Sequence, residues 1–172
     1  GQREIEQFYQ VPRDRIRLFP HPTPRFALQA TPADPQVLAK WNLQPGFLFY
    51  PAQFWPHKNH AGLLEAARSL GERHGLRPQI VLVGSDKSNR RHIEQYAAEL
   101  GLGNQLKILG FVSREELVAL YQQAAALVYL TFFGPENLPP LEAIALGCPV
   151  VASRVSGSEE QLGSAALPVD PR

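Results

Sequence analysis

Two charged side chains stand where an expected strand passes through a loop into an expected helix. Lys58 ends the loop 52–58, and Glu142 lies in the first turn of a later helix. A lysine at such a place can reach an anion held by the positive end of a helix, whereas a carboxylate can accept hydrogen bonds from ribose hydroxyls. Each residue also has a plain structural interpretation, because lysines are usually solvated and a helix dipole favours an acidic first turn whatever the function.

The loop before Pro139 and Pro140 carries the strongest local signal for an anion site. The apolar run 125–130 predicts a strand, and the two prolines suit a first helical turn, since proline lacks the N–H that such a turn leaves unpaired. The backbone N–H groups around Asn137 and Leu138 would then lie at the carboxyl edge of a sheet and at the positive end of a helix. Such a place holds an anion.

Three further loop residues have two interpretations each. Glu136 could face a sugar or only water. Gly84 and Gly134 are most simply turn residues, and their functional interpretation is a close approach of the backbone to a ligand.

The whole chain repeats the order strand, loop, helix. Strands are expected at 15–19, 46–50, 79–83, 106–109, 125–130, 148–152 and 165–169. Helices are expected at 4–10, 34–41, 59–70, 89–100, 113–123 and 141–146. Apolar strands alternating with helices predict an α/β fold with a Rossmann-like open parallel sheet and helices on both faces. Loops that should meet at one edge of this sheet are 52–58, 84–88, 110–113 and 133–138.

We expect residues 1–172 to form a single domain, with 1–14 and 21–35 irregular or acting as linkers. The second of these segments is rich in proline, which makes regular structure unfavourable there. The chain contains no methionine and begins Gly-Gln-Arg, which indicates a piece of a longer protein.

Composition excludes several classes of function. Lys and Arg number 17 against 16 for Asp and Glu, so a net charge of +1 provides no broad basic field for nucleic acid. Cys148 is the single cysteine, and no apolar run reaches the length of a membrane span or signal-peptide core, which fits a reducing, cytoplasmic setting. The histidines do not have metal-site spacing, and neither a nicotinamide-binding nor a P-loop motif occurs. We therefore expect no metal and no cofactor.

Four stretches together resemble a known family. The residues LPPLEAIALGCPVVA at 138–152 resemble the GLPxLEAMAxGxPVVAS signature of retaining, nucleotide-sugar-dependent glycosyltransferases of family 4, which have the two-domain GT-B fold. PHKNH at 56–60 resembles the lysine motif of this family, and 81–84 and 109–113 are similar to its two other loop signatures. Order and spacing agree across nearly all of residues 15–170.

The resemblance implies that the chain is the C-terminal, donor-binding half of a GT-B enzyme whose N-terminal acceptor domain is absent. Lys58 would bind the diphosphate of a nucleoside-diphosphate sugar, and the backbone at Asn137 and Leu138 would meet its phosphates. Glu142 would hold the ribose and Val112 would lie beside the base. The implied reaction is metal-independent, retaining transfer to a glycan or lipid-linked acceptor in cell-envelope polysaccharide synthesis, in the cytoplasm or at the inner face of the membrane.

Two positions depart from the family pattern. Two glutamates usually stand with seven residues between them, but Gly134 occupies the place of the first and Glu136 comes two positions later, where we expect it to act with Lys58 in catalysis. Gln53 stands where the family usually has an arginine, and it can hydrogen-bond a phosphate without neutralising it. His57 or Arg154 could supply the missing charge. These departures suggest one alternative, a degenerate nucleotide-sugar-binding domain that has lost transfer. A different GT-B enzyme, such as a sugar-nucleotide epimerase, is a second alternative.

Overall fold

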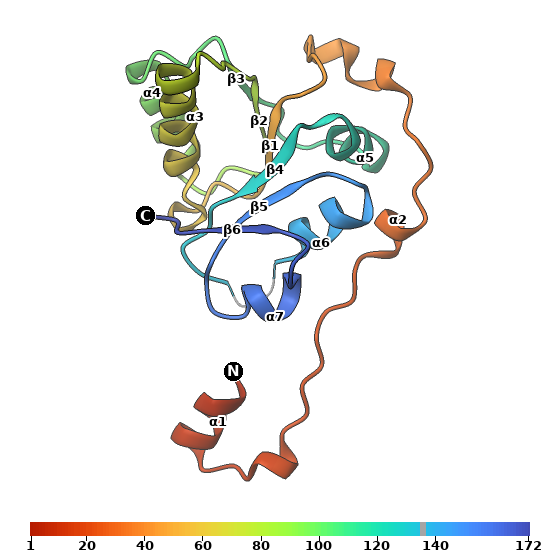
Figure 1. Cartoon of the computed structure of the whole chain (residues 1–172), viewed down its shortest axis with the longest axis vertical. Helices are drawn as coiled ribbons and strands as arrows, with labels where there is room; N and C mark the ends of the chain where they lie inside the picture. The colour runs from red at the N-terminus through yellow and green to blue at the C-terminus, as the bar shows by residue number, and fades with distance from the viewer. Residues whose placement is uncertain (135–136) are drawn as a thin grey trace.

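A parallel sheet organises the chain. The computed structural model describes residues 1–134 and 137–172, and within them six parallel strands form one sheet in the order β3-β2-β1-β4-β5-β6 (Figure 1). The strands are β1 (Leu48–Pro51), β2 (Ile80–Val83), β3 (Leu106–Ile108), β4 (Ala126–Tyr129), β5 (Val150–Ser153) and β6 (Leu167–Val169). Six of the strands expected from the sequence are therefore confirmed, and so is the α/β fold class.

The centre of the sheet is apolar on both faces. Phe49 of β1 is in register with Val81 of β2 and with Leu127 of β4, and all three side chains are fully buried. Side chains of successive strand residues point to opposite faces, so strands without polar alternation need helices on both sides. This requirement explains why the apolar runs of the sequence belong to a covered parallel sheet.

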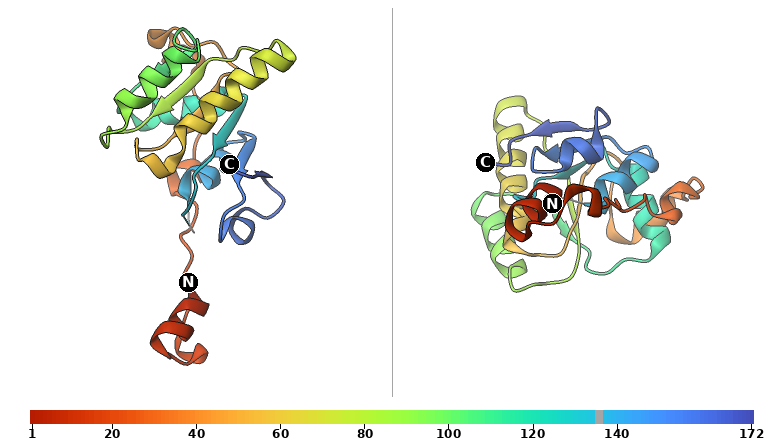
Figure 2. Two further views of the ribbon diagram at one scale, coloured as in Figure 1. Left: turned by 90° about the vertical axis from the view of Figure 1, so that its left-hand side faces the viewer. Right: turned by 90° about the horizontal axis from the view of Figure 1, so that it is seen from below.

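Helices cover both faces of the sheet. α3 (His60–His74) and α4 (Arg90–Glu99) lie on one face, whereas α5 (Arg114–Gln123) and α6 (Leu138–Ala145) lie on the other (Figures 1 and 2). Each confirms a helix expected from the sequence, and α6 includes both prolines in its first turn. A short helix between β5 and β6, α7 (Ser158–Leu162), has no counterpart among the expected elements.

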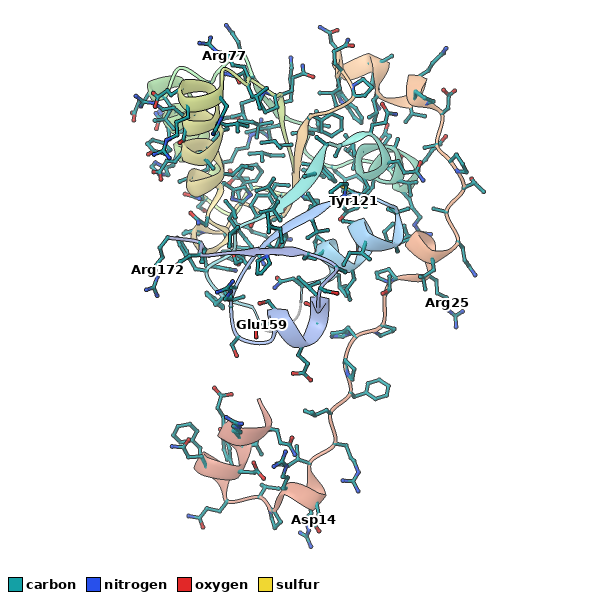
Figure 3. All side chains as sticks on the ribbon, viewed as in Figure 1. Asp14, Arg25, Arg77, Tyr121, Glu159 and Arg172 are labelled. Carbon is teal, nitrogen blue, oxygen red and sulfur yellow. The ribbon has the colours of Figure 1, made fainter. Side chains whose placement is uncertain are left out.

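The N-terminal segment stands apart from the sheet (Figures 1 and 3). It contains α1 (Gln2–Tyr9) and the 3₁₀ turn η1 (Arg13–Arg15). The strand expected at 15–19 is wrong. Within the described residues no strand lies beside this segment to pair with its backbone, and Leu18 and Phe19 are exposed.

The two segments expected to be irregular contain short helices. α1 confirms the helix expected at 4–10, so residues 1–14 are not wholly irregular. Between 21 and 35 the chain forms α2 (Arg25–Leu28), whose Ala27 is buried and which packs against α6. The next segment, η2 (Pro35–Trp41), is a 3₁₀ helix capped by Asp34, as its Asp-Pro start predicts. No helix in the described part of the chain has the length and apolar character needed to cross a bilayer.

The strand order places a topological switch point between β1 and β4. The chain leaves β1 toward α3 on one face and leaves β4 toward α6 on the other, so the two connections diverge at neighbouring strands. Open α/β sheets bind ligands at such a switch point, outside the carboxyl ends of the strands. The loops that follow β1 and β4 are those that carry Lys58 and Asn137.

Candidate functional site

Hydrogen bonds hold both the backbone and the side chain of Lys58. It ends the 3₁₀ turn η3 (Pro56–Lys58), and its backbone carbonyl accepts a hydrogen bond from the Tyr50 hydroxyl. Its ammonium Nζ donates to the Tyr129 hydroxyl at 3.0 Å and to Asn137 Oδ1 at 3.3 Å. The ammonium therefore faces the start of α6, which is the geometry expected from the sequence.

The Lys58 ammonium is half-buried and has only neutral hydrogen-bond partners among the described residues. Burial lowers the pKa of Lys58, which shows that its charged form is incompletely solvated. Burial, and then the charge of Glu142, raises the pKa of Tyr129, so the phenol that Lys58 contacts stays neutral. Among the described residues no carboxylate forms an ion pair with Lys58. A half-buried cation in this state is suited to an anionic ligand.

The start of α6 offers one backbone donor rather than several. Pro139 and Pro140 have no N–H, and the Asn137 N–H donates to the side-chain oxygen of Gln161 at 3.1 Å. This corrects the expectation that the Asn137 amide meets a phosphate. The Leu138 N–H has no acceptor within the described residues and lies at the positive end of the helix.

Because of the same two prolines, the Asn137 side chain is not used to cap α6. An N-cap side chain normally accepts a hydrogen bond from the second or third helical N–H, and here these positions are Pro139 and Pro140. Asn137 makes no capping bond. Its Oδ1 instead accepts from Lys58, and its Nδ2 donates to the Gly134 carbonyl at 2.9 Å. The cap residue of α6 is thus turned toward the lysine.

Two glycines allow close approaches at this edge of the sheet. Gly134 has φ +137°, and a Cβ there would lie 3.1 Å from Asn137 Oδ1, so a glutamate at this position would press on the side chain that meets Lys58. Gly84 has φ +156°, and its Cβ would lie 2.2 Å from the Ala52 carbonyl oxygen, a contact that no side chain permits. Glu136, expected to serve in catalysis, lies outside the described residues.

Glu142 is anchored from α5. Its Oε2 accepts a hydrogen bond from the Tyr121 hydroxyl at 2.7 Å, and Tyr121 lies buried between α5 and the sheet (Figure 3). Burial raises the pKa of Glu142, an effect that the Tyr121 hydrogen bond opposes. The second oxygen, Oε1, has no protein donor among the described residues, so the carboxylate can still accept from a ligand hydroxyl.

The remaining expected residues lie around this centre. Gln53 Oε1 accepts from the Trp55 indole N–H at 2.9 Å, which leaves only its amide nitrogen for a ligand. Val112 is buried in the core, so only its backbone can border a base. Arg154 is exposed, and its guanidinium lies 4.0 Å from the Glu159 carboxylate on α7 rather than at the lysine.

His57 links the loop after β1 to the loop after β4 by hydrogen bonds. Its carbonyl accepts from the Phe132 N–H at 2.9 Å and from the Thr131 hydroxyl at 3.1 Å. Its ring lies between Trp55 and Phe133, with centroid separations of 6.4 and 4.4 Å. Burial and the charge of Lys58 lower the pKa of His57, which favours the neutral imidazole and leaves the lysine as the main positive charge here.

Tyr50, Tyr129, Tyr121 and Gln161 belong to the arrangement but were not predicted from the sequence. The first two lie near the carboxyl ends of β1 and β4, the strands on either side of the switch point, and this position is a signal that could have identified them. Gln161 could not be found in this way, because α7 is too short to show a helical pattern.

A family model for glycosyl transferases group 1 matches residues 36–170. The chain belongs to this family. The match includes every described residue of the arrangement above, from Tyr50 to Gln161.

A relative agrees with this assignment, and two solved structures share the fold. The O-antigen chain mannosyltransferase B of Escherichia coli is 32% identical over 170 residues, which are 98% of this chain and 45% of that protein. The structure of WaaG, a glycosyltransferase involved in lipopolysaccharide biosynthesis, superposes with a TM-score of 0.81 at 20% identity, over 98% of this chain and 46% of WaaG. Anabaena HepE in complex with UDP superposes with a TM-score of 0.72 at 21% identity, over 84% of this chain and 41% of HepE. The chain therefore spans less than half of each of these proteins.

Proposed function

We propose that this group 1 glycosyl transferase chain binds the nucleoside-diphosphate part of a sugar donor between Lys58 and the start of α6. The observation that carries the proposal is the Lys58 ammonium, half-buried without an anionic partner in the described residues and 3.3 Å from the cap residue of α6. The switch point between β1 and β4, the Leu138 N–H and the helix dipole add to the support for a diphosphate here.

The other contacts follow from the same placement. Glu142 accepts hydrogen bonds from the ribose through its unoccupied oxygen. UDP in HepE and the mannosyltransferase name of the Escherichia coli relative support a nucleoside-diphosphate hexose as the donor. We propose a glycan or lipid-linked acceptor in the synthesis of a cell-envelope polysaccharide, bound mainly by a part of the protein beyond these residues.

The chemistry of transfer is electrostatic on this account. As the bond between the sugar and the phosphate oxygen breaks, its electron pair passes to the nucleoside diphosphate, whose charge grows beside Lys58 and the helix end. Preorganised positive charge at that position stabilises the transition state more than the ground state. Lysine and helix can supply this charge without a metal, so we propose metal-independent, retaining transfer. A role for Glu136 and the cytoplasmic location stay predictions from the sequence.

Calorimetry with UDP, GDP and ADP tests the proposal on this chain. We expect at least one of them to bind, and Lys58→Ala to weaken it by about 1.5 to 3 kcal/mol, roughly 10- to 150-fold, because a charged hydrogen bond is lost. Gln53→Ala should cost less than Lys58→Ala, since a neutral amide N–H binds a phosphate less strongly than an ammonium does. Lys87→Ala is the matched control, because Lys87 stacks over the Trp55 ring rather than contacting α6.

Two outcomes contradict the proposal. One is the absence of heat with all three nucleotides on protein shown to be folded. The other is a Lys58→Ala variant that binds as tightly as the wild type.

A second candidate, a binding domain that has lost transfer, is favoured by the Gly134 backbone and the engaged Gln53 side chain. Sugar transfer by the longer natural protein would exclude it, whereas nucleotide binding with no transfer to any acceptor would support it.

A further inference from the structure

Gln161 makes two hydrogen bonds to the backbone of one residue at the candidate site. Its side-chain oxygen accepts from the Asn137 N–H at 3.1 Å, and its side-chain nitrogen donates to the Asn137 carbonyl at 3.1 Å. Asn137 has extended backbone angles, φ −129° and ψ 117°. A primary amide can pair with both groups of an extended residue in the way that a neighbouring strand does.

This pairing fixes Asn137, whose position affects both hydrogen-bond donors of the site, the Lys58 ammonium and the Leu138 N–H. Asn137 carries the side chain that meets Lys58, and it directly precedes Leu138, whose N–H opens α6. Within its own loop the Asn137 side chain is bonded to the Gly134 carbonyl. Among the described residues, Asn137 makes hydrogen bonds to other elements at Lys58 and at Gln161, and the bonds to Gln161 of α7 are the ones that hold its backbone.

We propose that Gln161 is a positioning residue for the diphosphate site, holding the Asn137 backbone so that the Asn137 side chain and the Leu138 N–H face the same ligand as Lys58. The inference rests on the proposed function, because the ligand positioned is the donor diphosphate. Gln161 need not contact that ligand, since both polar atoms of its side chain are used by Asn137. The amide is the side chain of this length that provides a donor and an acceptor without a charge.

The charge and the hydrogen-bonding pattern of residue 161 can be separated by substitution. Gln161→Leu keeps the approximate size of the side chain and removes both bonds. Gln161→Glu keeps an acceptor for the Asn137 N–H, but near neutral pH it sets a carboxylate against the Asn137 carbonyl and adds negative charge beside the diphosphate. When protonated, the same glutamate regains one donor and one acceptor.

The test is calorimetry of the whole chain with the nucleoside diphosphate that gives heat with the wild type, among UDP, GDP and ADP. We expect Gln161→Leu to bind about tenfold more weakly near neutral pH, because a freed loop must be ordered on binding. Gln161→Glu should bind roughly 50-fold more weakly. At about pH 5, closer to the ordinary carboxyl pKa, Gln161→Glu should recover part of its affinity relative to wild type, whereas Gln161→Leu should not. A general loss of structure would not produce this difference.

Two further measurements separate the possible failures. Hydrogen exchange of the Asn137 amide, followed by NMR without nucleotide, should be faster in Gln161→Leu than in wild type. This measurement reports the hydrogen bond between Asn137 and Gln161 independently of nucleotide binding. Glu160→Gln, on the exposed side of α7, should bind and exchange like wild type. If Lys58→Ala weakens binding but Gln161→Leu binds like wild type, the inference is overturned and the proposed function stands. If the wild type binds none of the three nucleotides, the proposed function fails and takes the inference with it.

Discussion

The starts of α5 and α6 lie at the same edge of the sheet, but only one of them is closed by its own residues. At α5, the Ser113 hydroxyl accepts from the Glu116 N–H at 3.2 Å, and the Glu116 carboxylate accepts from the Ser113 N–H at 2.6 Å. Lys40 also donates to Glu116. At α6, the Asn137 side chain makes no bond to the first turn and contacts Lys58 instead.

The difference comes from which residues follow the cap. A capping side chain needs an N–H two or three positions into the helix, and α5 supplies one at Glu116. α6 has Pro139 and Pro140 at these positions, so its cap cannot close on the helix. The comparison teaches that prolines can keep a helix start available for a ligand by removing the donors with which the helix would otherwise satisfy its own cap.

The substitution with the largest expected effect on the difference between the α5 and α6 starts gives α6 a negative charge at its cap. Asn137→Asp places a carboxylate where Oδ1 now meets Lys58, and this carboxylate would pair with the ammonium and repel a diphosphate. We expect the affinity for the nucleoside diphosphate to fall on the order of 100-fold, about 2.7 kcal/mol. The free energy of unfolding should change by less than about 1 kcal/mol, because a negative charge is favourable at a helix start but the hydrogen bond to the Gly134 carbonyl is lost. Calorimetry and denaturant unfolding measure the two effects.

Ser113→Asp is the control for this substitution. Aspartate is a good N-cap, so the change places the same charge at a helix start that is already closed. Nucleotide affinity should stay within about twofold of wild type, because Ser113 is bonded to the start of α5 and has no hydrogen bond to Lys58 or Asn137 among the described residues. Equal losses of affinity in the two variants would show that the effect comes from net charge and not from the open start of α6.

The capping box at α5 could be predicted from the sequence, because Ser113 and Glu116 are neighbours along the chain. The same holds for the apolar runs that became β1 to β6 and for the meeting of Lys58 with the start of α6, since the carboxyl ends of parallel strands share an edge. These predictions depend on local pattern or on a general rule of parallel sheets.

What could not be predicted depends on partners distant in the sequence. The alternating residues at 15–19 indicate a strand locally, but a strand also needs a neighbour, and the described residues provide none. Gln161 and Asn137 are 24 positions apart, and α7 has only five residues. No signal in the sequence therefore indicated that the Asn137 N–H bonds to Gln161. The two prolines, in contrast, do indicate that the Asn137 side chain cannot cap α6.

Opening the closed start of α5 should affect stability and leave binding unchanged. Ser113→Ala removes the hydroxyl that accepts from Glu116, and the loss of such a cap costs about 1 kcal/mol. For a chain of this size the melting temperature should fall by about 2 to 4 °C. Nucleotide affinity should match wild type, because the exposed N–H groups belong to α5, whereas Lys58 contacts the cap residue of α6. A clear loss of affinity would mean that α5 also contacts the ligand.

Closing the open start of α6 is the subtlest test of the comparison. Pro139→Ala restores an N–H at the second helical position, where the Asn137 side chain can accept from it and turn away from Lys58. Nucleotide affinity should fall by about threefold, since the lysine loses a neighbour that orients it but keeps its charge. Pro35→Ala at the start of η2 is the matched control. The Asp34 side chain there already caps its helix by accepting from the Gln36 N–H at 2.9 Å, so a new N–H does not draw it away from Lys58 or a ligand. A structure of Pro139→Ala in which Asn137 still contacts Lys58 would show that the prolines are not what directs this side chain.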